Sequence, residues 1–107
     1  MNRLEQLEAF LKEQPTDDFL RYAIAQEHYK IGNLDTCQSI FEALVKESPE
    51  YSATYYHLGK LYEKKGQSEE AISTYKKGIE ITIKNKENHA LSELKSALLE
   101  LELDDLI

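Results

Sequence analysis

Three histidines and one cysteine are the residues of this sequence that most readily suggest chemistry. His28, His57 and His89 are widely separated, so no two of them have the His-x-x-x-His spacing with which one helix presents two imidazoles to a zinc ion. Cys37 is the single cysteine, so the chain has no Cys-x-x-Cys motif. The sequence therefore predicts neither a metal site nor an internal disulfide.

His28 and Cys37 form the one arrangement that a nucleophilic mechanism could use, because both are expected on partner helices. An imidazole activates a thiol only where the thiol is exposed and a third group orients the base. The alternative is that both side chains fill buried positions, and we adopt that interpretation. The sequence also contains no glycine-rich phosphate loop and no nucleophile elbow. We therefore expect no catalytic residue, no cofactor and no enzymatic activity.

The composition limits the classes of partner. The 107 residues carry a net charge of -7, which disfavours binding to phosphate backbones and anionic membranes, so we expect no nucleic acid and no membrane as partner. No apolar run approaches the roughly 20 residues of a membrane span. The glutamates at positions 5, 8 and 13 do not fit a secretory signal. A lone cysteine suits a reducing compartment, and we expect a cytoplasmic protein.

Apolar residues recur at helical spacing along the chain, and no stretch alternates as a β-strand does. The expected helices are separated by Pro15, the turn at Gly32, Pro49, Gly66 and the polar stretch KNKEN at 84–88. Short connections of this kind make consecutive helices antiparallel. The pattern predicts an all-α protein of six helices.

Comparison of the chain with itself at an offset of 34 residues reveals a repeat. Turn residues coincide, and residues inside the helices coincide in size. The matching pairs are Pro15 and Pro49, Gly32 and Gly66, Ile24 and Leu58, Ala25 and Gly59, His28 and Tyr62, Cys37 and Ala71, and Phe41 and Tyr75. A period of this length, with a turn inside each unit, indicates stacked helix-turn-helix repeats.

Small residues inside these helices explain how two helices of one unit approach each other. Antiparallel helices come within about 8 Å only where one of them offers a missing side chain to the other. We predict that Gly59 faces Ala71 in the second unit and that Ala25 faces Cys37 in the first. Tyr62 and Tyr75 would then fill the remaining space between the helices.

The second unit resembles the tetratricopeptide repeat (TPR) family. Its matching residues are Tyr55, Leu58-Gly59, Tyr62, Ala71, Tyr75 and Gly78, and the first unit matches at Ile24-Ala25, Cys37, Phe41 and Pro49 but departs at Arg21, His28 and Leu44. The resemblance implies antiparallel helical hairpins stacked as a short right-handed α-solenoid. It implies a single TPR domain over 1–107, made of a half-repeat helix at 1–15, repeats at 18–49 and 52–84, and a capping helix at 88–103.

The resemblance also implies a concave surface lined by the first helix of each repeat. The residues that it places there as peptide-binding residues are Phe19, Tyr22, Gln26, Tyr29, Lys30, Tyr56, His57, Lys60 and Lys64. Ala23, Ala53 and Glu63 share this register, and a last helix displaced by two residues would add His89, Ser92, Glu93 and Ser96. Tyrosines beside lysines suit a peptide with apolar anchors and a carboxylate. The alternative is that these side chains only solvate the surface.

The chaperone-binding members of the family clamp a C-terminal carboxylate with lysine, asparagine and arginine side chains at fixed positions. Tyr22, Gln26 and His57 occupy positions of that clamp, so the resemblance does not extend to this specific function.

Two functions therefore remain open for this chain. The first is an adaptor that binds a protein or peptide partner through the concave surface. The second is a self-associating structural protein, in which the acidic end LELDDLI, with Leu103, Leu106 and Ile107, mediates homo-oligomerisation. The same end is equally consistent with a frayed helix terminus.

Overall fold

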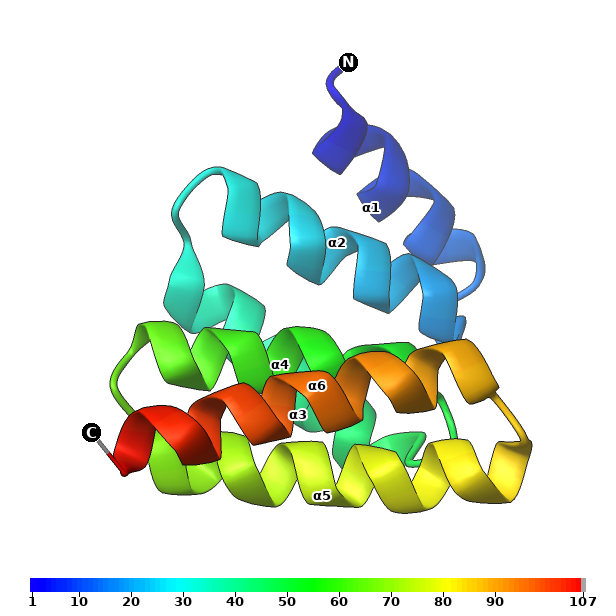
Figure 1. The fold of residues 1–107 in the computed structure, drawn as a ribbon. Helices are drawn as coiled ribbons and strands as arrows, with labels where there is room; N and C mark the ends of the chain where they lie inside the picture. Colours follow the sequence, from blue (N-terminus) through cyan, green and yellow to red (C-terminus); the bar gives the residue numbers. More distant parts are fainter. Residues whose placement is uncertain (107) are drawn as a thin grey trace. The chain divides into compact units, whose positions relative to one another are not determined.

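The computed structural model describes residues 1–106, which form six α-helices and, within that range, no β-strand. The helices are α1 (Arg3–Glu13), α2 (Asp18–Lys30), α3 (Leu34–Glu47), α4 (Ala53–Lys64), α5 (Ser68–Asn85) and α6 (Asn88–Asp105) (Figure 1). They group into two compact units, Met1–Tyr51 and Ser52–Ile107. The predicted all-α fold class is confirmed.

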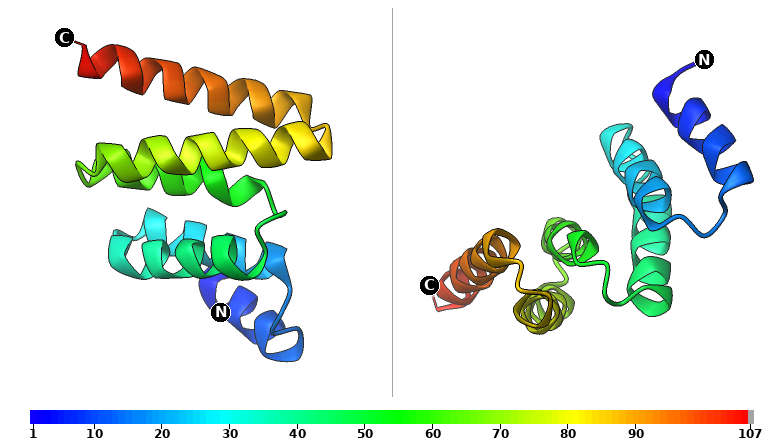
Figure 2. Two further views of the ribbon diagram at one scale, coloured as in Figure 1. Left: turned by 90° about the horizontal axis from the view of Figure 1, so that it is seen from below. Right: turned by 90° about the vertical axis from the view of Figure 1, so that its right-hand side faces the viewer.

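The first unit contains α1, α2 and α3, with α1 and α3 each packed against α2 (Figure 2). Leu7 of α1 is buried with Ala23 and Ile24 of α2, which gives this unit its apolar centre. Asp17 caps α2, because its carboxylate accepts a hydrogen bond of 2.9 Å from the backbone N–H of Leu20.

Glycine ends the first helix of each hairpin where the sequence predicted a turn. Gly32 and Gly66 have φ angles of 86° and 75°, a left-handed conformation that residues with a Cβ rarely adopt. A Cβ at either position would meet no atom within 4 Å, so the backbone conformation rather than crowding requires glycine.

The second unit contains α4, α5 and α6, in which each helix is antiparallel to the one before it (Figures 1 and 2). Its helices approach at glycines, as predicted, but the residue that faces Gly59 is Tyr75. A Cβ on Gly59 would lie 2.7 Å from both Cδ1 and Cζ of the Tyr75 ring. Gly78 is equally crowded, because a Cβ there would lie 2.6 Å from the Cβ of Tyr55. The atoms nearest to Gly59 thus belong to the Tyr75 ring, which lies one turn after Ala71, the partner that the sequence predicted.

The connection before the last helix is shorter than the stretch KNKEN suggested. Helix α5 continues to Asn85 and α6 begins at Asn88, so two residues connect them. The repeat explains the extension, since Ile83 occupies the position of Pro49, which follows the end of α3 and cannot continue a helix. Lys86 turns the chain with a φ of 60°.

A serine and a carboxylate close each hairpin at the same place. The Ser48 hydroxyl, at the end of α3, donates a hydrogen bond of 2.7 Å to Asp18 at the start of α2. The Ser52 hydroxyl, before α4, donates one of 2.9 Å to Glu87, which follows α5. These bonds hold the start of the first helix beside the end of the second.

Candidate functional site

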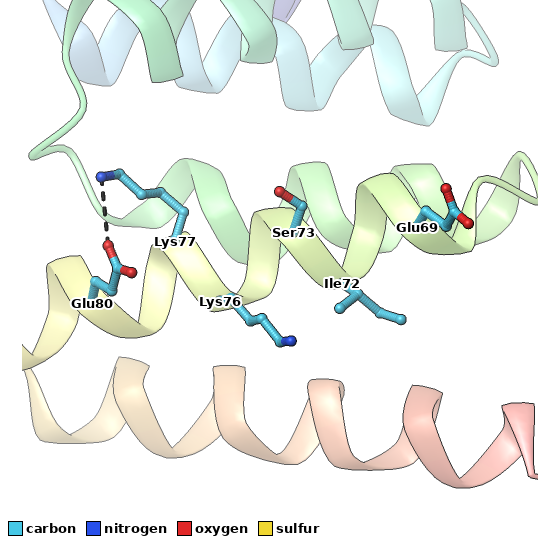
Figure 3. Close-up of a pocket in the computed structure, with 6 residues that line it drawn as sticks. All are labelled: Glu69, Ile72, Ser73, Lys76, Lys77 and Glu80. Carbon is cyan, nitrogen blue, oxygen red and sulfur yellow. Dashed lines mark ion pairs between the residues drawn. The ribbon is translucent and has the colours of Figure 1, made fainter.

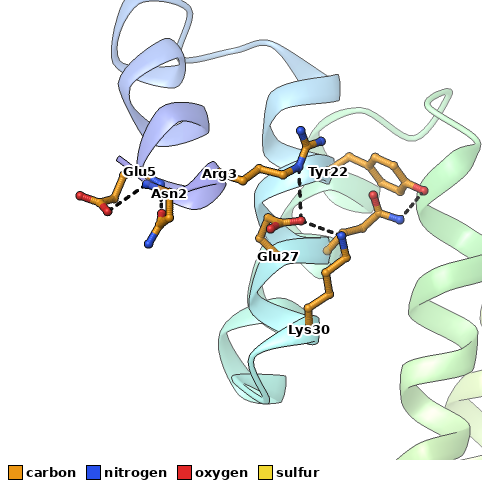
Figure 4. A network of polar contacts seen from close by, with 7 residues as sticks. Asn2, Arg3, Glu5, Tyr22, Glu27 and Lys30 are labelled. Atoms are coloured by element: carbon orange, nitrogen blue, oxygen red, sulfur yellow. Dashed lines mark hydrogen bonds and ion pairs between the residues drawn. The ribbon is translucent and has the colours of Figure 1, made fainter.

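Five of the predicted peptide-binding residues lie on α2 in the first unit. Phe19 and Tyr29 are exposed, with 56% and 41% of their surfaces accessible, Lys30 is also exposed, and Tyr22 and Gln26 are half-buried. The Tyr22 hydroxyl accepts a hydrogen bond of 3.0 Å from the Gln26 side chain (Figure 4). Its ring lies 6.0 Å from that of Phe41 and 5.9 Å from that of Tyr51, measured between centroids. Most of this stripe is therefore available to a ligand, and Tyr22 is held in place.

Ala23 shares the register of this stripe but does not reach its surface. It is 2% exposed and packs with Leu7 and Ile24, so it belongs to the core of the first unit.

Lys30 on α2 shares its carboxylate partner with an arginine. The Glu27 carboxylate lies 3.0 Å from the Lys30 ammonium and 3.4 Å from the Arg3 guanidinium, and Figure 4 shows both ion pairs. Because one carboxylate serves two cations, it offsets the charge of Lys30 only in part.

In the second unit, α4 and α6 enclose a groove of about 230 Å³. Because both helices are antiparallel to α5, they run in the same direction, and side chains from both reach the groove. Its lining residues are Tyr56, Lys60, His89, Ser92, Glu93, Ser96, Ala97 and Glu100. The groove thus brings together two of the predicted α4 residues and the four α6 residues expected from the two-residue displacement.

Glu100 lines the groove but was not among the predicted residues. It lies 36 residues after Lys64, which is the last α4 position of the predicted surface. The same separation relates Tyr56 to Ser92 and Lys60 to Ser96. Extending the same register by one more turn of α6 would therefore have found it.

A chain of contacts fixes the position of Lys60 in the groove. Its ammonium lies 3.7 Å from the Glu63 carboxylate and 5.6 Å from the centre of the Tyr56 ring. The buried Tyr75 hydroxyl donates a hydrogen bond to the same Glu63 carboxylate. Burial and this hydrogen bond raise the pKa of Tyr75, so the phenol stays protonated and remains a donor. Tyr75 also fills the notch at Gly59, and it therefore connects the packing of the hairpin to the groove.

His57 and Lys64 do not line the groove. His57 is half-buried, with its ring centroid 5.5 Å from that of Tyr56. Burial lowers the pKa of His57, and the nearby Glu93 carboxylate partly opposes this effect. Lys64 is exposed on the last turn of α4.

Comparisons with known proteins agree with this geometry. A family model described as tetratricopeptide repeat matches residues 52–82. A tetratricopeptide repeat domain protein from Salinibacter ruber, solved by solution NMR, is 48% identical over 82% of this chain and 89% of that chain, with a TM-score of 0.80. The chain belongs to the tetratricopeptide repeat family. Proteins of this family generally mediate protein–protein interactions, and the match indicates no enzyme family.

Other solved structures share the TPR fold. The crystal structure of the Salinibacter ruber domain is 48% identical and has a TM-score of 0.79 over 80% of this chain and 97% of that chain. The type III secretion translocator chaperone SycD from Yersinia enterocolitica has a TM-score of 0.86 over 97% of this chain and 72% of that chain, at 14% identity. That likeness concerns the fold alone. A search of curated proteins gave no match.

A larger hollow of this TPR protein, of about 460 Å³, lies along α5 (Figure 3). It is lined by Glu69, Ile72, Ser73, Lys76, Lys77 and Glu80. All six residues come from one helix, and the Lys77 ammonium lies 3.6 Å from the Glu80 carboxylate. This hollow is the outer surface of a helix, whereas the smaller groove has walls from two helices.

The residues that suggested nucleophilic or metal chemistry occupy ordinary TPR positions. Cys37 is fully buried, and burial raises the pKa of its thiol to about 11, so the reactive thiolate is suppressed at neutral pH. His28 is half-buried rather than buried, and its Nδ1 lies 3.4 Å from the Asn33 side-chain nitrogen. Within residues 1–106, no three His, Cys, Asp or Glu side chains are grouped to hold a metal ion.

None of the helices in the described part of the chain has the length and apolar character needed to cross a membrane.

Proposed function

We propose that this TPR protein is a non-catalytic, cytoplasmic adaptor that binds a peptide segment of a protein partner in the groove between α4 and α6. One observation carries the proposal: two helices of the repeat array direct an aromatic ring, a lysine and hydroxyl groups into one open groove. Grooves that combine a flat apolar surface with a few positioned polar groups suit peptide ligands.

The groove offers a peptide distinct kinds of contact. The half-buried Tyr56 ring provides a rigid face for an apolar side chain, at a low cost in conformational entropy. The hydroxyls of Ser92 and Ser96 both donate and accept hydrogen bonds, so they can pair with a peptide backbone. Lys60 is held beside Glu63 and the Tyr56 ring before a ligand arrives, so this wall of the groove needs little ordering on binding.

The stripe on α2 is a separate contact region, which belongs to the first unit alone. Phe19 and Tyr29 are exposed aromatic side chains, and the hydrogen bond between Gln26 and Tyr22 keeps the latter's ring in place. Exposed aromatic residues are over-represented where proteins bind each other.

The test uses the full chain and a display library of random peptides. Peptides selected on the wild-type protein should lose about tenfold or more in affinity for the variant Tyr56→Ala, because aromatic anchors dominate such interfaces. The matched control is Ile72→Ala, which removes an apolar side chain from the surface of α5. Unchanged affinity for the groove variant, or an equal loss in the control, would reject the proposal.

A second candidate function, self-association, is favoured by one feature of α6. Leu99 and Leu103 on α6 and Leu106 at its end are exposed, the last of them at 82%, and Ile107 lies outside the described residues. Exposed leucines on one helix can pack against a second copy of the chain. Light scattering should then give a larger mass for the full chain than for a chain without its last five residues. If both are monomers, self-association is rejected.

A further inference from the structure

We infer that the peptide bound between α4 and α6 presents two basic side chains, three residues apart, to Glu93 and Glu100. This inference rests on the proposed function and specifies the ligand chemistry of the same groove. It replaces the expectation, drawn from the sequence, that the ligand offers a carboxylate to the lysines.

The charges in the groove favour a basic ligand. One lysine and two glutamates line it, so its formal charge is negative when the histidine is counted as neutral. The charge of Lys60 is already offset by Glu63 at 3.7 Å. A ligand carboxylate would have to compete with Glu63 for this lysine and would also face Glu93 and Glu100.

Neither of these two glutamates is strongly paired within the protein. Glu93 lies 3.6 Å from Nε2 of His89, but the His89 side chain is 92% exposed, and such surface pairs contribute little. Glu100 makes no ion pair within residues 1–106. Both carboxylates are exposed, so a ligand can reach them without first breaking a buried contact.

The spacing of the two carboxylates sets the spacing of the basic side chains. Glu93 and Glu100 are two turns apart on α6, so they lie on the same face of the helix, about 10 Å apart along its axis. A peptide in the polyproline II conformation returns to the same side every three residues, after about 9 Å. A basic-x-x-basic segment therefore matches the two carboxylates, and an intervening apolar residue can lie against Tyr56.

The first test compares four synthetic peptides with the same background sequence by fluorescence anisotropy on the full chain. They carry a Lys-x-x-Lys segment, two adjacent lysines, a Glu-x-x-Glu segment or no charge. We expect Lys-x-x-Lys to bind about threefold to tenfold more tightly than the adjacent pair, and its affinity to fall as salt is added. Equal affinity of the two basic peptides, or tighter binding of the acidic or the uncharged peptide, would overturn the inference.

The second test separates the groove from general attraction to an acidic protein. The double variant Glu93→Gln/Glu100→Gln should bind the Lys-x-x-Lys peptide about tenfold more weakly. The control Glu80→Gln/Glu102→Gln removes the same charge from exposed positions outside the groove, and we expect less than about a twofold change. Equal losses in the two variants would overturn the inference.

The two proposals can fail separately. If library peptides without basic residues bind and depend on Tyr56, the groove binds peptides but the inferred ligand charge is wrong. If selected peptides bind independently of Tyr56, the proposed function itself is rejected.

Discussion

Replacement of Gly59 by alanine tests the close packing of α4 and α5. In an exposed helix this change stabilises a protein by about 1 kcal/mol, because alanine has the higher helix propensity. In this protein the added Cβ would lie 2.7 Å from two atoms of the Tyr75 ring, which is well inside van der Waals contact. We therefore expect the opposite sign, a loss of stability.

The size of the effect follows from what Tyr75 has to give up. Overpacking a filled core costs about 1–3 kcal/mol. The Tyr75 ring is fully buried, so it cannot move away freely. Moving it would also weaken its hydrogen bond to the Glu63 carboxylate, and hydrogen bonds to charged groups contribute about 1.5–3 kcal/mol to stability. After subtracting the gain in propensity, Gly59→Ala should lower the free energy of unfolding by about 2 kcal/mol, which for a chain of this size lowers Tm by roughly 10 °C.

Thermal and urea unfolding followed by circular dichroism measure this change. The first hairpin supplies a matched pair, because Ala25 and Phe41 occupy the positions of Gly59 and Tyr75. The double variant Gly59→Ala/Tyr75→Phe should be more stable than the sum of its single changes predicts, by about 1 kcal/mol, because a ring without the hydroxyl is free to tilt away. A Tm of Gly59→Ala at or above that of the wild type would refute the close approach.

Three further predictions follow from buried groups. Ala71→Leu should lower the free energy of unfolding by about 1–3 kcal/mol, since Ala71 is fully buried, and an unchanged Tm would count against its position in the core. Cys37 should not react with a thiol reagent in the folded protein and should react fully in urea, because its thiol is buried and its pKa is raised to about 11; rapid reaction in the folded state would contradict this. Burial lowers the pKa of His57 from 6.5, so the imidazole binds a proton more readily in the unfolded chain than in the folded one. The contribution of neutral His57 to the free energy of unfolding is therefore complete above about pH 6.5 and declines as the pH falls toward the folded pKa. Urea unfolding at about pH 7 and about pH 5.5 should therefore show a smaller pH dependence for His57→Gln than for the wild type, and an identical dependence would exclude this role for His57.

The helices and their turns could be predicted from the sequence because local chemistry determines them. Glycine provides positive φ at Gly32 and Gly66, and proline halts a helix at Pro49. The length of α5 was harder to predict, because no residue marks its end in the way that Pro49 marks the end of α3. The second repeat has Ile83 at the position of Pro49, so the helix continues through it. Which atoms come closest to Gly59 could not be predicted either, because that depends on how the two helices are rotated against each other.

The residues that line the candidate site could largely be predicted from the register of the repeat. The repeat spacing places Tyr56 and Lys60 opposite the polar residues of α6, and the structure brings these residues into one groove. The lysines suggested a ligand with a carboxylate, which stays a prediction, and the inferred basic ligand is its alternative. The pairs Lys60–Glu63 and Glu27–Lys30 have the three-residue spacing at which helical side chains meet, so the sequence already indicated that each lysine has a carboxylate beside it.

The most direct test of the account is to map a selected peptide onto the protein by amide chemical shifts in the full chain. If the groove between α4 and α6 is the binding site, the largest changes should occur at Tyr56, Lys60, Ser92 and Ser96, with little change along the outer surface of α5 around Ile72 and Lys76. Changes centred on that α5 surface, with the groove residues unaffected, would contradict the central claim.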